Sequence, residues 1–151
     1  MSDHTSDAAV TRVRHDGGLR FSATIRDHTV VMDQPLSNGG EDTAASPMEL
    51  LSAALGGCAA LYVHQFCAAR GIADDGMSVD VITENARKPY RVGRFAIRVT
   101  LPPGFPDEYR AAVERAVMTC PVHNTFLHPP AVELDIAVGV YEGVDGAVSS
   151  R

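Results

Sequence analysis

The chain lacks an excess of basic residues: it has 13 lysines and arginines against 19 aspartates and glutamates, and a formal net charge of −6. Surfaces that bind nucleic acid or anionic membranes need clustered lysine and arginine, so this balance argues against both partners. The sequence also lacks an apolar run of the about 18 residues that a membrane span needs. Its first residues are polar and acidic, without the basic and apolar regions of a signal peptide. We therefore expect a cytoplasmic protein.

Cysteine is scarce as well, with three residues in 151. In a reducing compartment such cysteines are catalytic, metal-binding or inert rather than a structural disulfide framework. The sequence has no G-x-S-x-G motif of a serine hydrolase and no glycine-rich nucleotide-binding motif. The sequence therefore gives no support to a serine hydrolase or to a nucleotide-binding protein.

What is present is a composition typical of a folded protein, with 45% hydrophobic and 21% charged residues. The length favours one domain. We expect that domain to span residues 10–141, between a flexible N-terminal tail at 1–9 and a loose C-terminal tail at 142–151.

The hydrophobic pattern predicts strands, a helix, strands, helices and a final strand, which is typical of the α+β class. Alternation of apolar and polar residues predicts a hairpin over residues 19–32, with a third strand near 10–14. A second strand pair is predicted over 77–86 and 91–101. Amphipathic and short helices follow at 106–118 and 121–127, and a strand at 132–140.

The longest element is a helix that we expect to begin at Ser46-Pro47 and run to about Arg70, with Gly71 as its stop signal. Serine at the N-cap, proline at the first position and Glu49 at the third form a capping box. The helix is apolar nearly all round, and such helices are buried on most sides. In so small a chain this burial most easily comes from two sheets or from a second subunit, and we expect a homodimer.

Two of the cysteines have unusual settings. Cys58 follows two glycines inside the long helix, where each glycine costs about 1 kcal/mol relative to alanine. Cys120 precedes a proline at a helix start, where backbone N–H groups and the helix dipole favour a thiolate. Each also has a simpler interpretation: Cys58 as a small buried hydrophobe, and Cys120 as an N-cap residue.

The third cysteine, Cys67, lies nine residues after Cys58, about 180° around the helix, so these two thiols face opposite sides. A zinc site at Cys120 and His123 would show only one close-spaced ligand pair, whereas structural zinc usually has two. Several arginines in residues 10–33 could stabilise a thiolate, and the sequence does not choose between them.

The stretch Ser46-Pro47-Met48-Glu49-Leu50-Leu51 leading to Gly57-Cys58, with Cys120-Pro121-Val122-His123 some sixty residues later, resembles the OsmC/Ohr family. The likeness covers roughly residues 17–140 and is greatest to the OsmC-like (YhfA-type) branch. It implies an OsmC-like fold in which two sheets pack around long central helices in an intertwined homodimer.

The resemblance also implies a thiol peroxidase that reduces organic hydroperoxides, and perhaps hydrogen peroxide, in oxidative-stress defence. Cys58 matches the peroxidatic cysteine and Cys120 the resolving cysteine. No metal or organic cofactor is implied, and an external dithiol would reduce the oxidised enzyme.

One departure concerns the support of the thiolate. Family members with strong activity carry a glutamate directly after the proline, and it holds an arginine beside the thiol. Here Met48 occupies that position and Glu49 follows it. Arg20 is the best match to the arginine, and Arg26 is second. We therefore expect weak peroxidase activity, and the alternative is a non-catalytic protein on the same fold that binds a hydrophobic ligand or senses redox state.

Overall fold

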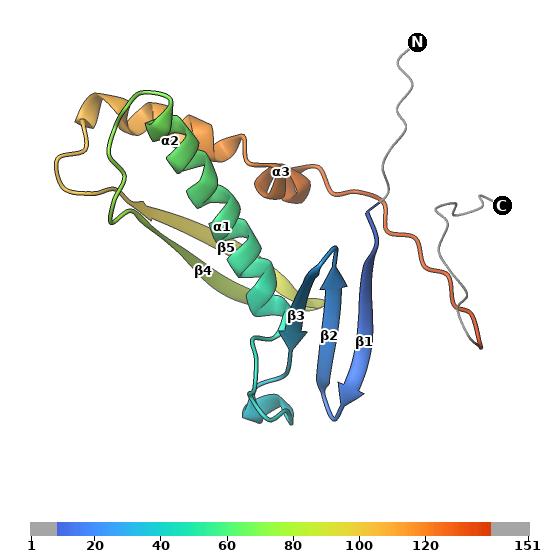
Figure 1. Cartoon of the computed structure of the whole chain (residues 1–151). Coiled ribbons are helices and arrows are strands. Elements are labelled where there is room, and N and C mark those ends of the chain that lie inside the picture. The colour runs from blue at the N-terminus through green and yellow to red at the C-terminus, as the bar shows by residue number, and fades with distance from the viewer. Residues whose placement is uncertain (1–8, 140–151) are drawn as a thin grey trace, which may run out of the picture. The chain divides into compact units, whose positions relative to one another are not determined.

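The structure is a computed structural model that describes residues 9–139 (Figure 1). It divides into two compact units, one of residues 45–130 and one that contains residues 9–44 and 131–139. Apart from Ala9, the tails expected at 1–9 and 142–151 lie outside the described residues. The two antiparallel sheets and the helices together confirm the α+β class.

A three-stranded antiparallel sheet in the order β1-β2-β3 forms the N-terminal unit. The register pairs Val13 with Ala23, and Ala23 with Val30, so the buried Ala23 lies at the centre of the sheet. A tight turn between β2 and β3 contains Arg26 with a left-handed φ of 53°. The predicted hairpin and third strand are therefore confirmed, with bounds β1 Thr11–Gly17, β2 Arg20–Ile25 and β3 His28–Met32.

After β3 the chain forms a loop that a buried carboxylate holds closed. Asp33 accepts hydrogen bonds from the backbone N–H of Gln34 at 2.7 Å, the backbone N–H of Thr43 at 3.0 Å and the Thr43 hydroxyl at 2.8 Å. These donors hold the pKa of Asp33 below its usual value, with the Thr43 backbone as the largest cause. The single short helix in this loop, η1, spans Leu36–Asn38.

The long helix α1 spans Pro47–Ala68. Its capping box is present as predicted: Glu49 accepts from the Ser46 backbone N–H at 2.7 Å, and the Glu49 N–H donates to the Ser46 hydroxyl oxygen at 3.4 Å. The helix ends two residues before the expected Arg70. Gly71, with φ 64°, lets the Ile72 N–H donate to the Cys67 carbonyl at 3.0 Å, which satisfies an end carbonyl.

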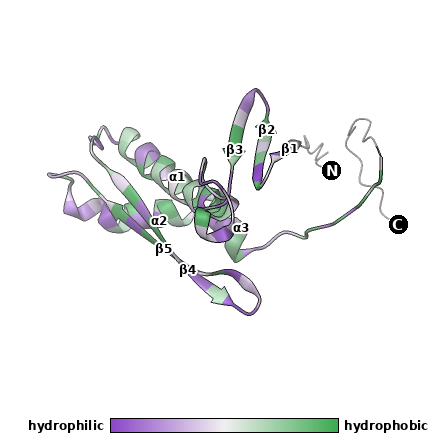
Figure 2. Ribbon diagram, turned by 90° about the horizontal axis from the view of Figure 1, so that it is seen from below, coloured by the Kyte–Doolittle hydropathy of each residue, from purple (hydrophilic) through white to green (hydrophobic). Residues whose placement is uncertain are grey.

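By length and composition alone α1 could also cross a membrane, although the core helix of a soluble protein passes the same test. One third of its most apolar window, 33%, is buried within the described structure. Figure 2 shows hydrophobic residues along α1 and along the strands on which it packs.

The second unit contains a two-stranded antiparallel sheet against which α1 packs, chiefly on β4. Its second helix, α2, packs on α1, and α3 contacts α1 as well. The core lies between α1 and α2 and includes Val63, Phe66, Val113 and Val117. The bounds are β4 Ser78–Arg87, β5 Tyr90–Thr100, η2 Asp107–Tyr109, α2 Arg110–Met118 and α3 Pro121–Leu127.

The strand predicted at 132–140 is the one element that the structure contradicts. Residues 132–139 form no strand, and residue 140 lies outside the described residues. The pattern fits a strand, since Val132, Leu134, Ile136 and Val138 alternate with other residues. A strand is assigned only where its backbone pairs with a neighbour, and this segment pairs with none of the strands described.

Candidate active site

Two cysteines that are 62 positions apart in sequence meet where α1 contacts α3. Cys58 lies in the middle of α1 and is half-buried, and Cys120 is the buried N-cap residue of α3. Cys120 lies near enough to Cys58 to affect the pKa of its thiol, and both thiols are free rather than joined as a disulfide. The structure thus brings together the two cysteines that the sequence singled out, within one compact unit.

The surroundings of Cys58 raise the pKa of its thiol above the ordinary value. Desolvation by burial is the largest cause, because a thiolate loses hydration there. The hydrogen bond to Cys120 also favours the neutral thiol, and charge on Cys120 acts in the same direction. As it stands in this unit, the thiol is therefore less acidic than an ordinary cysteine.

One contact opposes this effect, and sequence reasoning missed it. The backbone N–H of Val122 donates to the Cys58 sulfur, which lowers the pKa of Cys58 because the bond favours the thiolate. Val122 lies in the first turn of α3, where backbone N–H groups have no partner within the helix. Pro121 at the helix start was the signal that could have found it, since the free amides of a helix start need acceptors.

Cys67 is held apart from this pair. It is fully buried in the core, together with Val63 and Val117. Burial, and secondarily the charge of Asp74, raise the pKa of the Cys67 thiol, and Arg70 opposes them. This agrees with the helical phase expected from the sequence, which puts Cys58 and Cys67 on opposite sides of α1.

The carboxylate of Glu49 is engaged in capping α1. Besides the backbone N–H of Ser46, it accepts from the Ser46 hydroxyl at 2.7 Å, and these two bonds lower the pKa of Glu49. Arg20 opens β2 in the N-terminal unit, and Arg26 forms the following turn. Since neither arginine belongs to the unit that holds Cys58, the support of a thiolate by Arg20 and Glu49 stays a prediction.

The histidines near these elements have local partners. His64 bonds the Asp74 carboxylate at 2.8 Å, and His123 bonds the Met118 carbonyl at 3.2 Å. Within residues 9–139, no three side chains of histidine, cysteine, aspartate or glutamate gather closely enough to hold a metal ion.

Two neighbouring free thiols, one half-exposed and one buried, are suited to a two-step oxidation. The exposed sulfur can react with an oxidant and become a sulfenic acid. The second sulfur, which belongs to the same compact unit, can then close a disulfide.

Comparison with known proteins identifies the family of this chain. The family model for OsmC-like protein matches residues 39–135. A structure from Psychrobacter arcticus 273-4, named for osmotic stress induction and a detoxification response, is 25% identical with a TM-score of 0.73, over 81% of this chain and 90% of that one. No match is found among curated proteins.

Two further structures are named as organic hydroperoxide resistance proteins. One, from Legionella pneumophila, is 18% identical with a TM-score of 0.63, over 81% of this chain and 90% of that one. The other, from Elizabethkingia anophelis, is 16% identical with a TM-score of 0.61, over 80% and 90%. At these identities the two show a shared fold. Because the family model covers most of the chain, including both Cys58 and Cys120, the protein belongs to the OsmC-like family.

Proposed function

We propose that this protein is a cytoplasmic thiol peroxidase that reduces organic hydroperoxides through Cys58 and Cys120. The observation that carries the proposal is the presence of two free thiols where α1 contacts α3, of which only Cys58 is partly exposed. Membership of a family whose structural relatives include organic hydroperoxide resistance proteins supports the choice of oxidant.

The reaction proceeds in three steps. The Cys58 thiolate attacks the O–O bond of the hydroperoxide, so that a sulfur–oxygen bond forms and the alcohol leaves after taking up a proton. The sulfur of Cys120 then attacks the resulting sulfenic acid, forming a disulfide and releasing water. An external dithiol reduces that disulfide by exchange and becomes a disulfide itself.

The raised pKa of Cys58 bears on the rate of the first step. A thiol is a poor nucleophile, and the fraction present as thiolate falls as the pKa rises. Burial and Cys120 raise that pKa, and the Val122 N–H lowers it, so we expect weak turnover at neutral pH.

The test is peptide mapping after treatment with one equivalent of cumene hydroperoxide. We expect a Cys58–Cys120 disulfide, with Cys67 recovered as a thiol once the protein is unfolded and alkylated. Peroxide consumption with a dithiol should stop in Cys58→Ser and continue in the matched control Cys67→Ser. In Cys120→Ser, Cys58 should be trapped as sulfenic or overoxidised acid. Consumption that persists in Cys58→Ser would contradict the role of Cys58, and wild-type protein that consumes no peroxide would instead favour a protein that binds a hydrophobic ligand.

We also propose that the protein is a homodimer with α1 at its centre. Met48, Leu51 and Leu61 on α1 are exposed in the single chain, and exposed apolar surface of this kind is characteristic of interfaces. Light scattering coupled to size exclusion should give twice the chain mass of 16.1 kDa. A monomer at micromolar concentration would refute the proposal.

A further inference from the structure

The hairpin of β4 and β5 carries an unusual share of the positive charge of the chain. Residues 85–98 hold five of the 13 basic residues and none of the 19 acidic residues. A local excess of cations therefore lies within a chain whose net charge is −6. Such a patch acts on a partner by itself, because at physiological salt charges interact over only about 8 Å. Its basic residues are Arg87, Lys88, Arg91, Arg94 and Arg98.

The turn of the hairpin presents cations that no carboxylate neutralises. Arg87 ends β4, Lys88 lies in the turn, and Arg91 is the second residue of β5, and all three are exposed. Among residues 9–139, no acidic side chain forms an ion pair with any of the three, whereas Arg94 binds Glu84 on the neighbouring strand. The turn is therefore a small, exposed cationic surface.

An aromatic side chain lies among these cations and bears on the kind of partner. Tyr90 is 71% exposed. Tyrosine and arginine are enriched among the residues that carry most of the binding energy in protein–protein interfaces. A nucleic acid or an anionic membrane is a long anionic surface that would also meet the acidic remainder of the chain, which would repel it. A protein partner needs negative charge only where it meets the turn, so the charge distribution favours an acidic protein.

The hairpin is joined to the candidate active site through α3. Phe95 of β5 packs on Phe126 of α3, with ring centroids 5.1 Å apart. The same helix begins after its N-cap residue Cys120 and contacts α1, which carries Cys58. A protein bound at the hairpin therefore docks on the same compact unit as the two thiols.

We propose that the turn of the β4–β5 hairpin is the docking surface for an acidic protein that carries the dithiol reductant. The inference rests on the proposed peroxidase function and specifies the kind of reductant. A small dithiol needs no docking surface, whereas a dithiol held on a protein must be brought to the Cys58–Cys120 disulfide. One thiolate of the partner attacks that disulfide, and the partner's second thiol then resolves the mixed disulfide. Two electrons and two protons pass from the partner to the two cysteines, and the partner becomes a disulfide.

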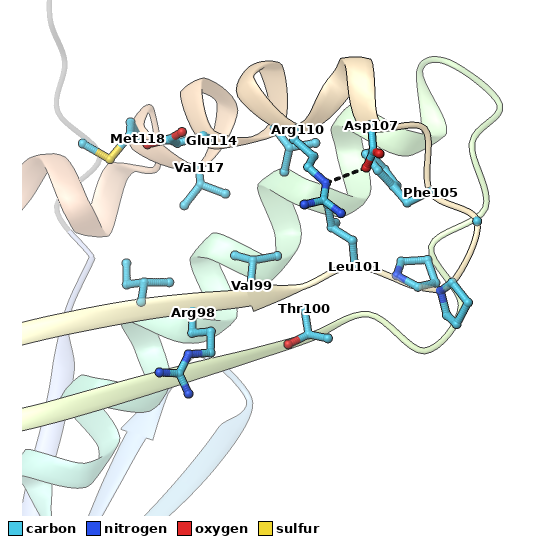
Figure 3. Close-up of a pocket in the computed structure, with 15 residues that line it drawn as sticks. Arg98, Val99, Thr100, Leu101, Phe105, Asp107, Arg110, Glu114, Val117 and Met118 are labelled. Carbon is cyan, nitrogen blue, oxygen red and sulfur yellow. Dashed lines mark ion pairs between the residues drawn. The ribbon is translucent and has the colours of Figure 1, made fainter.

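The test compares Arg87→Glu/Lys88→Glu with the control Arg110→Glu/Arg115→Glu, which changes the net charge by the same amount. All four side chains are exposed, so both variants should fold. Arg110 and Leu101 line a groove beyond the other end of β5 (Figure 3). That strand has 11 residues, so its ends are about 33 Å apart, well beyond the range of screened charges.

Each protein is oxidised with cumene hydroperoxide and mixed in a stopped-flow instrument with a reduced, acidic thioredoxin. This chain has no tryptophan, so tryptophan fluorescence follows the thioredoxin alone. At low ionic strength the rate constant of disulfide reduction should fall about tenfold in Arg87→Glu/Lys88→Glu, because attraction becomes repulsion. In the control it should stay within about twofold of wild type. Added salt should slow the wild-type reaction, and dithiothreitol should reduce all three proteins at one rate.

The dithiothreitol reaction separates failure of the docking surface from failure of the proposed function. Equal rate constants for the two variants with thioredoxin, or no reduction by thioredoxin at all, would overturn the docking surface. If cumene hydroperoxide forms no disulfide that dithiothreitol reduces, the proposed peroxidase itself fails. Equal thioredoxin rates, together with co-sedimentation of wild type but not of Arg87→Glu/Lys88→Glu with phosphatidylglycerol vesicles, would assign the turn to an anionic membrane instead.

Discussion

The substitution Gly56→Ala tests how closely α1 packs on β4. A Cβ atom added there would lie 2.9 Å from the Cγ2 atom of Val81 on β4, closer than real Cβ contacts allow. Gly56 is buried and lies two residues before Cys58. Its missing side chain therefore sets how closely the part of the helix that carries the reactive thiol approaches β4.

Two effects of opposite sign determine the result of Gly56→Ala. Replacing a glycine inside a helix by alanine stabilises the helix by about 1 kcal/mol. Overpacking a close contact typically costs about 1–3 kcal/mol. The contact is short and its neighbour is a stiff β-branched side chain, so we expect a net destabilisation of about 1 kcal/mol.

A double-mutant cycle with Val81→Ala separates the two effects. Removing the valine methyl groups opens the space that the new Cβ needs, so in that background Gly56→Ala should stabilise the protein by about 1 kcal/mol. Urea unfolding followed by circular dichroism, at one fixed protein concentration, measures all four variants. If Gly56→Ala stabilises the protein equally in both backgrounds, then β4 does not lie against Gly56 and the packing described above is wrong.

Three further outcomes are expected. Met48→Glu should raise peroxide turnover several-fold and lower the pH midpoint of Cys58 alkylation. Glu49→Gln should lower stability slightly and leave turnover unchanged. If Met48→Glu has no effect and Glu49→Gln abolishes turnover, then Glu49 is the carboxylate that supports the arginine. Cys120→Ala removes two of the three causes that raise the pKa of Cys58, so alkylation at pH 7.5 should become faster, and a slower rate would contradict that account. The lowered pKa of Asp33 stabilises the fold above the ordinary carboxyl pKa and loses that effect as pH falls, so Asp33→Asn should lower Tm at pH 7 and differ less from wild type near pH 3.

The elements predictable from the sequence are those whose signals are local. The capping box at Ser46 and Glu49 needs only residues three positions apart, and it is present. The turn after Ile25 and the stop at Gly71 likewise follow from neighbouring residues. The separation of Cys58 from Cys67 follows from helical phase alone.

The elements that were missed depend on partners distant in sequence. Residues 132–139 have the alternation of a strand, but alternation does not supply the edge with which a strand must pair. The pairing of Cys58 with Cys120 was not missed, but only family resemblance predicted it, because no spacing rule joins residues on two different helices. The Val122 N–H was missed because a backbone donor carries no side-chain signature.

The proposed chemistry needs a pair of cysteines and a cation, and the candidate residues for these belong to different units of the chain. Disulfide formation needs Cys58 and Cys120, which lie together in residues 45–130. Activation of the thiolate needs a cation, and the candidates Arg20 and Arg26 belong to the N-terminal unit. The contacts within the second unit mostly raise the pKa of Cys58, so that unit alone favours a resting thiol. Loss of the arginine should therefore slow the reaction with peroxide, while the disulfide that eventually forms stays the same.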